Sequence, residues 1–416
     1  MENKNTIRSK TASMHILLIH QAFASLDEAG GTRHFEIAAN LARNGHSITI
    51  LTSPISYLSG QKVNKRKIEE FADGKIKILR TYAYPALHKS FFHRTLNFIS
   101  FMTSSFLKGI RLKNLDLVWG TSPPIFQAAS AWLLARLKRV PFLLEIRDLW
   151  PAFAIEVGVL KNPLLIWLSQ WLEKFLYRHA DVVVVNSPGF IEHVKNKGAK
   201  KVEMIPNGSD IHLFATTNEG SAFRKNLNVQ DKYVVTYAGA HGLSNDLKIV
   251  LKSAELLISH PEIHFLLVGD GKEKPVLMET ARKLELTNLS FIDPVAKNKM
   301  AEVLAASDAC LAILKPLEMY KTTYPNKVFD YMAAGKPVLL AIDGVIRHVV
   351  EEAKCGIFIE PGNAEELSKK ILWLLNHPRE AKKMGMAGRQ QIEKKFDRVC
   401  LAGRFIAVFE ELVENG

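Results

Sequence analysis

The sequence predicts an α/β protein made of two doubly wound domains, each built on a parallel sheet. Its 416 residues exceed what one ordinary core organises, and two domains of about 200 residues are the natural division. In both halves, short apolar runs typical of buried strands alternate with helical periodicity. A polar stretch with little periodicity lies between the halves. We therefore expect domains at 1–206 and 231–395, a linker at 207–230 and a closing helix at 396–416 that returns to the first domain.

The first half begins with a βαβ unit. Residues 15–20 and 48–51 are expected strands, and a helix with apolar positions from Phe35 to Ala42 lies between them. The loop before this helix carries Gly30, Gly31 and Arg33. No G-x-G-x-x-G pattern is present, so the loop is not an NAD fingerprint. The paired glycines fit either close approach of a ligand phosphate or a tight turn, and both interpretations stay open.

Further strands of the first half are expected at 75–79, 116–119, 142–146, 181–185 and from 202, with helices at 125–139 and 163–179. The strand at 142–146 leads into Arg147-Asp148-Leu149-Trp150-Pro151. Doubly wound sheets bind ligands at the carboxyl ends of their strands. Glu145, Arg147 and Asp148 are therefore candidates for catalysis, and an Arg–Asp pair that only anchors the loop is the alternative.

Composition limits the partners. The net charge is +13, and residues 1–114 hold 17 Lys and Arg against 7 Asp and Glu. Such a basic region suits nucleic acid, anionic lipid or a phosphorylated substrate, but no recognition helix or aromatic repeat supports nucleic acid. Residues 88–113 are aromatic and apolar with basic flanks. Only 13 uncharged residues lie between Arg94 and Lys108, too few to span a bilayer, so we expect either a helix at a membrane interface or a core helix.

Cysteine usage and the N-terminus favour the cytoplasm. The three cysteines are widely separated and form no C-x-x-C pair, so neither a disulfide framework nor a zinc site is expected. Residues 1–13 are polar and do not resemble a signal peptide.

The second half is expected to form another open parallel sheet, with strands at 233–237, 263–268, 289–292, 309–314, 338–341 and 356–359. Two neighbouring strands end in glycine loops. The first loop contains Gly239, His241 and Gly242, and the second contains Gly269, Asp270 and Gly271 and is followed by Lys274. Each loop alone is a weak signal, but together they predict one crevice for a phosphate-bearing ligand.

A short helix follows Pro325, and Gly335 ends it. Asn326 suits its start, and Lys327 and Asp330 stand three residues apart in its first turn. The free N–H groups and positive dipole end of a helix attract phosphate. A cation for phosphate and a carboxylate for sugar hydroxyls suggest a nucleotide-sugar site here, whereas an ordinary helix with charges facing water is the alternative.

The order of these motifs resembles a known family. The motifs GG-x-R, R-D-L-W-P, I-P-N-G-x-D, G-x-H-G, V-G-D-G and P-N-K-x-F-D-Y-M-A-A-G-K-P are similar to those of family 4 glycosyltransferases, which have the GT-B fold. The resemblance covers nearly the whole chain. It is strongest with the branch that builds O-antigen and capsular polysaccharides, including N-acetyl-fucosamine transferases.

The resemblance implies a retaining, metal-independent transferase that uses a nucleotide-diphosphate sugar, usually UDP-linked, and needs no cofactor. The first domain would bind the acceptor and the second the donor. Lys327 and Lys274 would meet the diphosphate, and Asp330 would bind the ribose in place of the second glutamate of an E-x7-E pattern. The implied acceptor is a polyprenyl-diphosphate-linked glycan at the inner face of the cytoplasmic membrane, where the basic first domain would touch anionic lipid.

Two positions depart from the family pattern. Thr322 stands where the first glutamate of E-x7-E is expected, and Glu318 is the nearest substitute. Arg147 occupies a position where the family often has histidine. Two other functions share the predicted architecture: a non-hydrolysing UDP-sugar 2-epimerase, which needs no acceptor, and a protein that binds nucleotide sugars without turnover.

Overall fold

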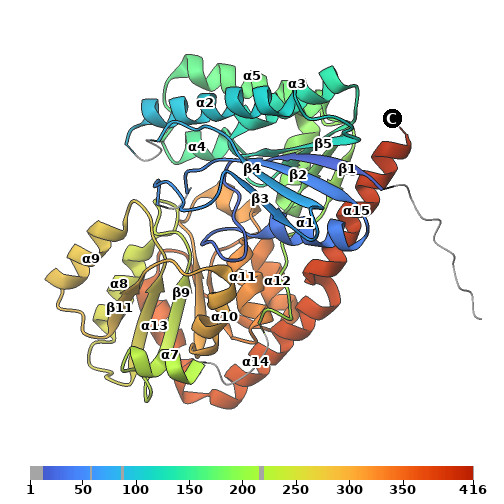
Figure 1. Ribbon diagram of the computed structural model, residues 1–416. Helices are drawn as coiled ribbons and strands as arrows, with labels where there is room; N and C mark the ends of the chain where they lie inside the picture. The colour runs from blue at the N-terminus through green and yellow to red at the C-terminus, as the bar shows by residue number, and fades with distance from the viewer. Residues whose placement is uncertain (1–12, 57–58, 86–88, 215–219, 416) are drawn as a thin grey trace, which may run out of the picture.

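The computed structural model describes residues 13–56, 59–85, 89–214 and 220–415. The predictions for residues 1–12, for part of the linker at 215–219 and for Gly416 therefore lie outside the described residues. The chain forms two α/β domains stacked on each other (Figure 1). The strands of the first sheet are β1 (His15–Ile19), β2 (Ser47–Thr52), β3 (Ile68–Phe71), β4 (Ile76–Arg80), β5 (Leu117–Ser122), β6 (Phe142–Ile146), β7 (Val182–Val185) and β8 (Val202–Met204).

These strands lie in the order β3-β4-β2-β1-β5-β6-β7-β8, and β3 alone runs antiparallel to its neighbour within the described residues. Central strands such as the four valines of β7 are apolar at every position because helices cover both faces of a parallel sheet. The first-domain helices are α1 (Arg33–Arg43), α2 (Phe91–Gly109), α3 (Ile125–Lys138), α4 (Ala152–Glu156), α5 (Pro163–His179) and α6 (Ile191–Asn196), with a 3₁₀ turn η1 (Pro188–Phe190).

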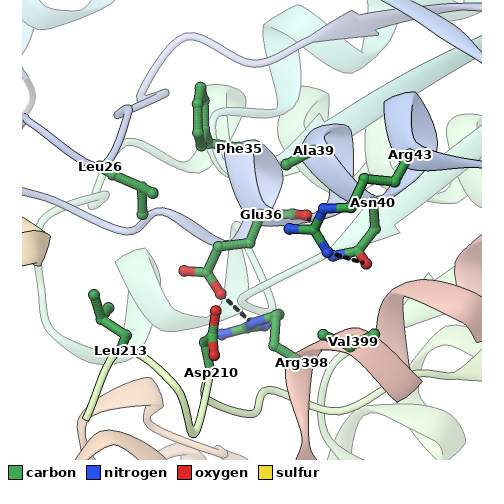
Figure 2. A pocket seen from close by; sticks show the side chains of 10 residues that line it. All are labelled: Leu26, Phe35, Glu36, Ala39, Asn40, Arg43, Asp210, Leu213, Arg398 and Val399. Carbon is green, nitrogen blue, oxygen red and sulfur yellow. Dashed lines mark hydrogen bonds and ion pairs between the residues drawn. The ribbon is translucent and has the colours of Figure 1, made fainter. Parts of the chain in front are cut away.

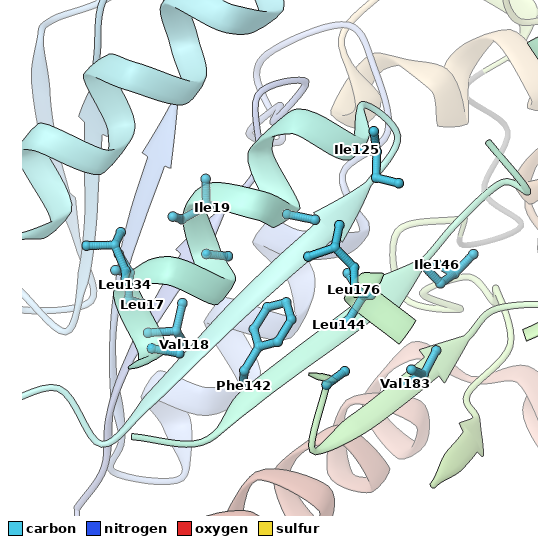
Figure 3. Packing of buried hydrophobic residues seen from close by; sticks show 14 of the residues in the cluster. Leu17, Ile19, Val118, Ile125, Leu134, Phe142, Leu144, Ile146, Leu176 and Val183 are labelled. Carbon is cyan, nitrogen blue, oxygen red and sulfur yellow. The ribbon is translucent and has the colours of Figure 1, made fainter. Parts of the chain in front are cut away.

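Two apolar cores sandwich the first sheet. One joins the sheet to α2, α3 and α5, and Figure 3 shows part of it, with Phe142 and Leu144 of β6 facing Ile125, Leu134 and Leu176. The other joins the opposite face to α1 and to the C-terminal helix α15 (Arg398–Glu414), whose Phe405 and Phe409 pack on Trp119. The last helix of the chain is thus part of the core of the first domain.

The second sheet is wholly parallel in the described residues, in the order β11-β10-β9-β12-β13-β14. Its strands are β9 (Tyr233–Ala238), β10 (Ile263–Val268), β11 (Leu289–Ile292), β12 (Ala309–Ile313), β13 (Val338–Ala341) and β14 (Gly356–Phe358). Its helical segments are α7 (Gly220–Asn226), α8 (Leu247–Leu256), α9 (Lys274–Lys283), α10 (Lys297–Ala305), η2 (Glu318–Thr322), α11 (Asn326–Ala333), α12 (Val345–Ala353), α13 (Ala364–Asn376), α14 (Pro378–Gln391) and η3 (Ile392–Phe396).

Every strand expected from the apolar runs is present, to within one or two residues at its ends. The one strand that the sequence analysis missed is β3. Its sequence is Ile-Glu-Glu-Phe and its residues are partly or fully exposed, because it lies at the sheet edge with β4 as its single neighbour. An edge strand with charged side chains lacks the apolar signal of a buried strand.

The chain crosses between the domains twice, and the two crossings run side by side. Ser209 N donates to Phe396 O, and Arg398 N donates to Ser209 O, at 3.1 Å each. Arg398 is buried, and its Nε donates to Glu36 of α1 at 2.7 Å (Figure 2). A cavity of about 60 Å³ lies against this ion pair, lined by residues of α1, of the first crossing and of α15. The crossings thus form one structural unit with α1.

Candidate functional site

The two glycine loops of the second domain are in direct contact. β9 and β10 are neighbours, and His241 N donates to Asp270 O at 2.8 Å. Gly269 has φ +146°, and a Cβ on it would stand 1.9 Å from the carbonyl oxygen of Gly239. A side chain therefore cannot be accommodated there. The two loops thus lie together at one end of the sheet, as predicted.

Lys327, in the first turn of α11, points at the first glycine loop. Its Nζ donates to Tyr237 Oη at 2.7 Å and to Asn245 Oδ1 at 3.3 Å, and it lies 4.0 Å from the centre of the Tyr237 ring. A Cβ on Gly239 would stand 2.9 Å from this ammonium group. No carboxylate of the described residues forms an ion pair with it. Burial lowers the pKa of Lys327 to about 7, so an anion bound here would favour the charged form.

Lys274 is less available than the sequence analysis expected. Its Nζ donates to Gly269 O at 3.0 Å and to Asp293 Oδ1 at 2.7 Å. The lysine is therefore hydrogen-bonded to the backbone of the second glycine loop and already has a carboxylate partner. Gly271 is held in the same loop, since its N–H bonds to the side chain of Asp270 at 2.8 Å.

His241 is buried between the loops. Neither ring nitrogen has a hydrogen-bond partner among the described residues. Burial, with the nearby charges of Lys274 and Lys327, lowers the pKa of His241 to about 4. The imidazole is therefore neutral near pH 7 and offers one donor and one acceptor. Gly242, the next residue, accepts from Asn245 N at 3.1 Å in the turn that brings Asn245 to Lys327.

Asp330 and Asn326, which were predicted to bind the donor, contact other protein groups in the structure. The Asp330 carboxylate is buried and accepts from Ser209 Oγ at 2.7 Å and from Lys297 Nζ at 2.5 Å. Asn326 donates to the same carboxylate at 3.3 Å and accepts from Arg398 Nη2 at 3.1 Å. Lys327 and Asp330 share a helical turn but contact different groups. Asp330 joins the helix to the interdomain crossing, and its ribose contact remains a prediction.

Thr322, which replaces the first glutamate of the E-x7-E pattern, lies where the two domains are in contact. The carbonyl oxygen of Thr322 accepts from Ser187 Oγ at 2.5 Å, and a Cβ on Gly189 would stand 2.6 Å from Thr322 Cα. Glu318, the nearest substitute for the missing glutamate, has a side chain that is 82% exposed and pairs with Lys321 at 2.8 Å. Its contact with the donor sugar stays a prediction.

Glu145 and Arg33 are buried and form an ion pair with each other, and their roles in catalysis and phosphate binding stay predictions. Glu145 is fully buried and accepts from Arg33 Nε at 2.9 Å and His34 Nε2 at 2.7 Å. Arg33 also donates to the carbonyls of Pro206 and Ile205, so it is not free for a phosphate. Burial alone would raise the pKa of Glu145, but His34 and Arg33 outweigh it and hold that pKa at about 2.

Burial lowers the pKa of His34 to about 4 despite the adjacent carboxylate. His34 is therefore neutral near pH 7 and donates its Nε2–H to Glu145, while Arg33 carries the compensating charge. This buried group ties α1 to β6 and to the end of β8.

Arg147 faces the other domain beside a histidine that the sequence analysis missed. Its Nη1 donates to His20 Nε2 at 3.0 Å, and His20 Nδ1 bonds to Thr121 Oγ1 at 2.8 Å. Burial, with His34 and Arg147, holds the pKa of His20 well below its usual value, so the ring is neutral. The available signal was its position directly after β1, at the carboxyl end of a central strand.

Asp148 forms no ion pair with Arg147, so the Arg–Asp anchor is not what the structure contains. Water reaches the Asp148 side chain, yet the many protein atoms around it raise its pKa to about 6. Burial raises the pKa of Tyr320 of η2, and the Asp148 carboxylate also raises it. Gly30 and Gly31 are exposed, and a Cβ on Gly31 would stand 3.6 Å from Arg147 Nη2. Arg147, Asp148 and the paired glycines thus lie together at the face towards the second domain.

Within the described residues, no group of three or more His, Cys, Asp and Glu side chains is placed to hold a metal ion. Lys327, Tyr237, His241 and the loop at Gly239 form the part of the second domain best suited to a diphosphate. Lys327 has no carboxylate partner, the ring nitrogens of His241 have no hydrogen-bond partner, and Gly239 has no side chain to cover the backbone of its loop.

Two families match consecutive parts of the chain. Residues 29–208 match the family described as glycosyl transferase 4-like domain, and residues 219–391 match glycosyl transferases group 1. The chain is 23% identical over 389 residues to N,N'-diacetylbacillosaminyl-diphospho-undecaprenol alpha-1,3-N-acetylgalactosaminyltransferase of Campylobacter jejuni. That alignment covers 90% of this chain and 98% of the relative.

Solved structures share the whole fold. Sucrose-phosphate synthase from Thermosynechococcus elongatus superposes with a TM-score of 0.76 at 18% identity, covering 97% of this chain and 100% of that one. HepE of Anabaena in complex with UDP-glucose gives 0.71 at 17% identity, covering 96% and 100%. Together with the two consecutive family matches, these likenesses show that the chain is a glycosyltransferase of the GT-B fold and belongs with the family 4 glycosyltransferases.

Proposed function

We propose that the enzyme transfers an N-acetyl amino sugar from a UDP-sugar to a sugar carried on a polyprenyl diphosphate, in the synthesis of a bacterial surface polysaccharide. The Campylobacter relative is named for a diphospho-undecaprenol acceptor and N-acetylgalactosamine transfer, and it aligns along nearly its whole length. HepE of Anabaena was solved with UDP and with UDP-glucose. These names support the acceptor class and the donor nucleotide.

The observation that carries the proposal is the partly buried ammonium of Lys327 beside Gly239, which forms no ion pair with a carboxylate of the described residues. When the bond between the anomeric carbon and the diphosphate breaks, its electron pair goes to the leaving oxygen. Lys327 and the N-terminus of α11, whose residue before the helix is Pro325 and makes no side-chain cap, would stabilise that charge. Because this positive charge is in place before the reaction, we propose that transfer needs no metal ion.

Retention follows in the proposal from attack on the same face of the sugar. The acceptor hydroxyl oxygen bonds to the anomeric carbon as the diphosphate departs, and the hydroxyl proton passes to a departing phosphate oxygen. In this proposal Arg147 and Asp148 of the first domain would orient that hydroxyl. Contact between the domains at Thr322 and Ser187 would help to exclude water, which otherwise hydrolyses the donor.

No described helix is long and apolar enough to cross a membrane. We propose that the enzyme works in the cytoplasm, at the inner face of the membrane that holds its acceptor.

The deciding experiment is a transfer assay with UDP-N-acetylgalactosamine, UDP-N-acetylglucosamine and UDP-glucose, each with and without a polyprenyl-diphosphate-linked sugar. We expect one donor to give a glycolipid product with a retained anomeric configuration, in the presence of EDTA. UDP-sugar isomerisation without acceptor would instead identify a 2-epimerase. Binding of UDP without any turnover would identify a nucleotide-sugar binding protein.

A further inference from the structure

The outer face of α5 is apolar although it is exposed. Leu164, Trp167, Leu168 and Trp171 follow the spacing i, i+3, i+4 and i+7, which places them on one side of a helix. Trp167 is 60% exposed and Trp171 is 55% exposed. The opposite side of the helix is in the core, where Leu176 and Tyr177 are buried. Both faces of the helix therefore carry apolar residues, and only one of these faces is covered by the rest of the domain.

The two neighbouring helices also carry exposed apolar residues. Leu133 and Leu137 of α3 and Leu107 of α2 are also exposed, and α3 contacts both other helices. Figure 1 shows α2, α3 and α5 as the outer layer of the first domain, away from the second domain. We call the surface made by Leu107, Leu133, Leu137, Leu164, Trp167, Leu168 and Trp171 the outer apolar face.

The segment 88–113 was expected to be either a core helix or a helix at a membrane interface, and α2 has features of both. Phe101 of α2 is fully buried, and Phe98 and Phe106 pack against the same core, so most of its aromatic residues are structural. The outer side of the helix, with Leu107, remains exposed. The tryptophans of α5, which the sequence analysis did not single out, are the larger apolar groups on this surface.

The exposed charges on the three helices that form the outer apolar face are all basic. Helices α2, α3 and α5 contain a single carboxylate, Glu173, which is fully buried and pairs with His193 and Lys197. Their exposed charged residues include Lys108, Arg136, Lys174 and Arg178. In the second domain, by contrast, the exposed Leu256 and Met278 each have an acidic neighbour in the sequence, Glu255 and Glu279.

We propose that the outer apolar face docks on a bilayer that contains anionic lipids. Tryptophan rings suit the headgroup level, leucine side chains the acyl boundary, and lysine and arginine the lipid phosphates. A second copy of the chain is a poorer occupant, because pairing two such faces would bring like charges together. The inference deepens the proposed function and rests on it, since a lipid-linked acceptor is presented at the same bilayer.

The test is co-sedimentation of the full-length protein with phosphatidylcholine vesicles, with and without phosphatidylglycerol, for the wild type and for Trp167→Glu/Trp171→Glu. We expect the wild type to bind the anionic vesicles and the variant to bind them roughly 10-fold or more weakly. The matched control is Leu256→Glu/Ile258→Glu, which places two carboxylates at exposed apolar positions of the second domain and should bind as the wild type does. Since both tryptophans are exposed, the variant should keep its thermal unfolding midpoint and its stabilisation by UDP.

Unchanged vesicle binding by the tryptophan variant would overturn the docking face, and so would wild-type protein that ignores anionic vesicles. Loss of a dimer in the variant, without loss of vesicle binding, would assign the face to a second copy instead. Wild-type protein that binds vesicles through this face but transfers no sugar to detergent-dispersed acceptor would contradict the proposed function and leave the docking face supported.

Discussion

Glu145 of the first domain and Lys327 of the second differ in how their charges are compensated. In the first domain, Glu145 of β6 is buried with Arg33 and His34 and has no free oxygen for a ligand. In the second domain, Lys327 is partly buried and has only neutral partners, the Tyr237 hydroxyl and the Asn245 amide. A buried charge needs compensation. Where the protein supplies the compensating charge, as at Glu145, the residue has a structural role. Where the protein supplies none, as at Lys327, a charged ligand is the natural partner.

The largest expected effect is on catalysis by Lys327→Ala. Removing the cation aimed at the leaving diphosphate should lower kcat by roughly 10²–10³-fold. Thermal unfolding should stay near that of the wild type, because the change also removes a partly buried charge that has no carboxylate partner. Lys274→Ala is the comparison, since Lys274 already pairs with the exposed Asp293 and should cost less than about 10-fold. Equal losses in the two variants would contradict the distinction between a ligand-binding lysine and a supporting one.

Glu145→Ala should act on stability. It leaves the Arg33 guanidinium buried without its carboxylate, which costs about 3–5 kcal/mol of unfolding free energy. Urea denaturation followed by circular dichroism measures the loss. Glu318→Gln, at an exposed glutamate paired only with Lys321, is the control and should change stability by less than about 0.5 kcal/mol. A stable Glu145→Ala protein with lost turnover would return Glu145 to the catalytic group.

A smaller effect is expected from pH. The folded-state pKa of His241 is about 4, below its usual 6.5, so the unfolded chain binds more protons between these values. Stability should therefore be full above pH 6.5 and fall as the pH is lowered towards 4, and His241→Ala should reduce that slope by up to about 3 kcal/mol over the range. Unfolding free energies of both proteins, measured from pH 7 to pH 4.5, test this. Parallel profiles would show that His241 is protonated as easily in the folded state as in the unfolded one.

Much of the site was predictable because its signals are local. The glycines after β9 and β10 were recognised from strand ends alone, and parallel strands bring their carboxyl ends to one edge. Lys327 was recognised from the start of its helix. His20 was within reach of the same argument, since it follows β1 directly, but a single histidine after a strand has no partner visible in the sequence. Its partner, Arg147, is 127 residues away.

The sequence by itself determined the two parallel sheets, because buried strands and covering helices leave apolar patterns within each short segment. It also placed the glycine loops and the start of α11. Only the tertiary structure decided which charges are compensated. Asp330 meets Ser209 and Lys297, and Glu145 meets Arg33, through contacts that join segments more than 30 residues apart. It also decided that α5 leaves its tryptophans uncovered, because an apolar helix face looks the same in sequence whether or not another element packs on it.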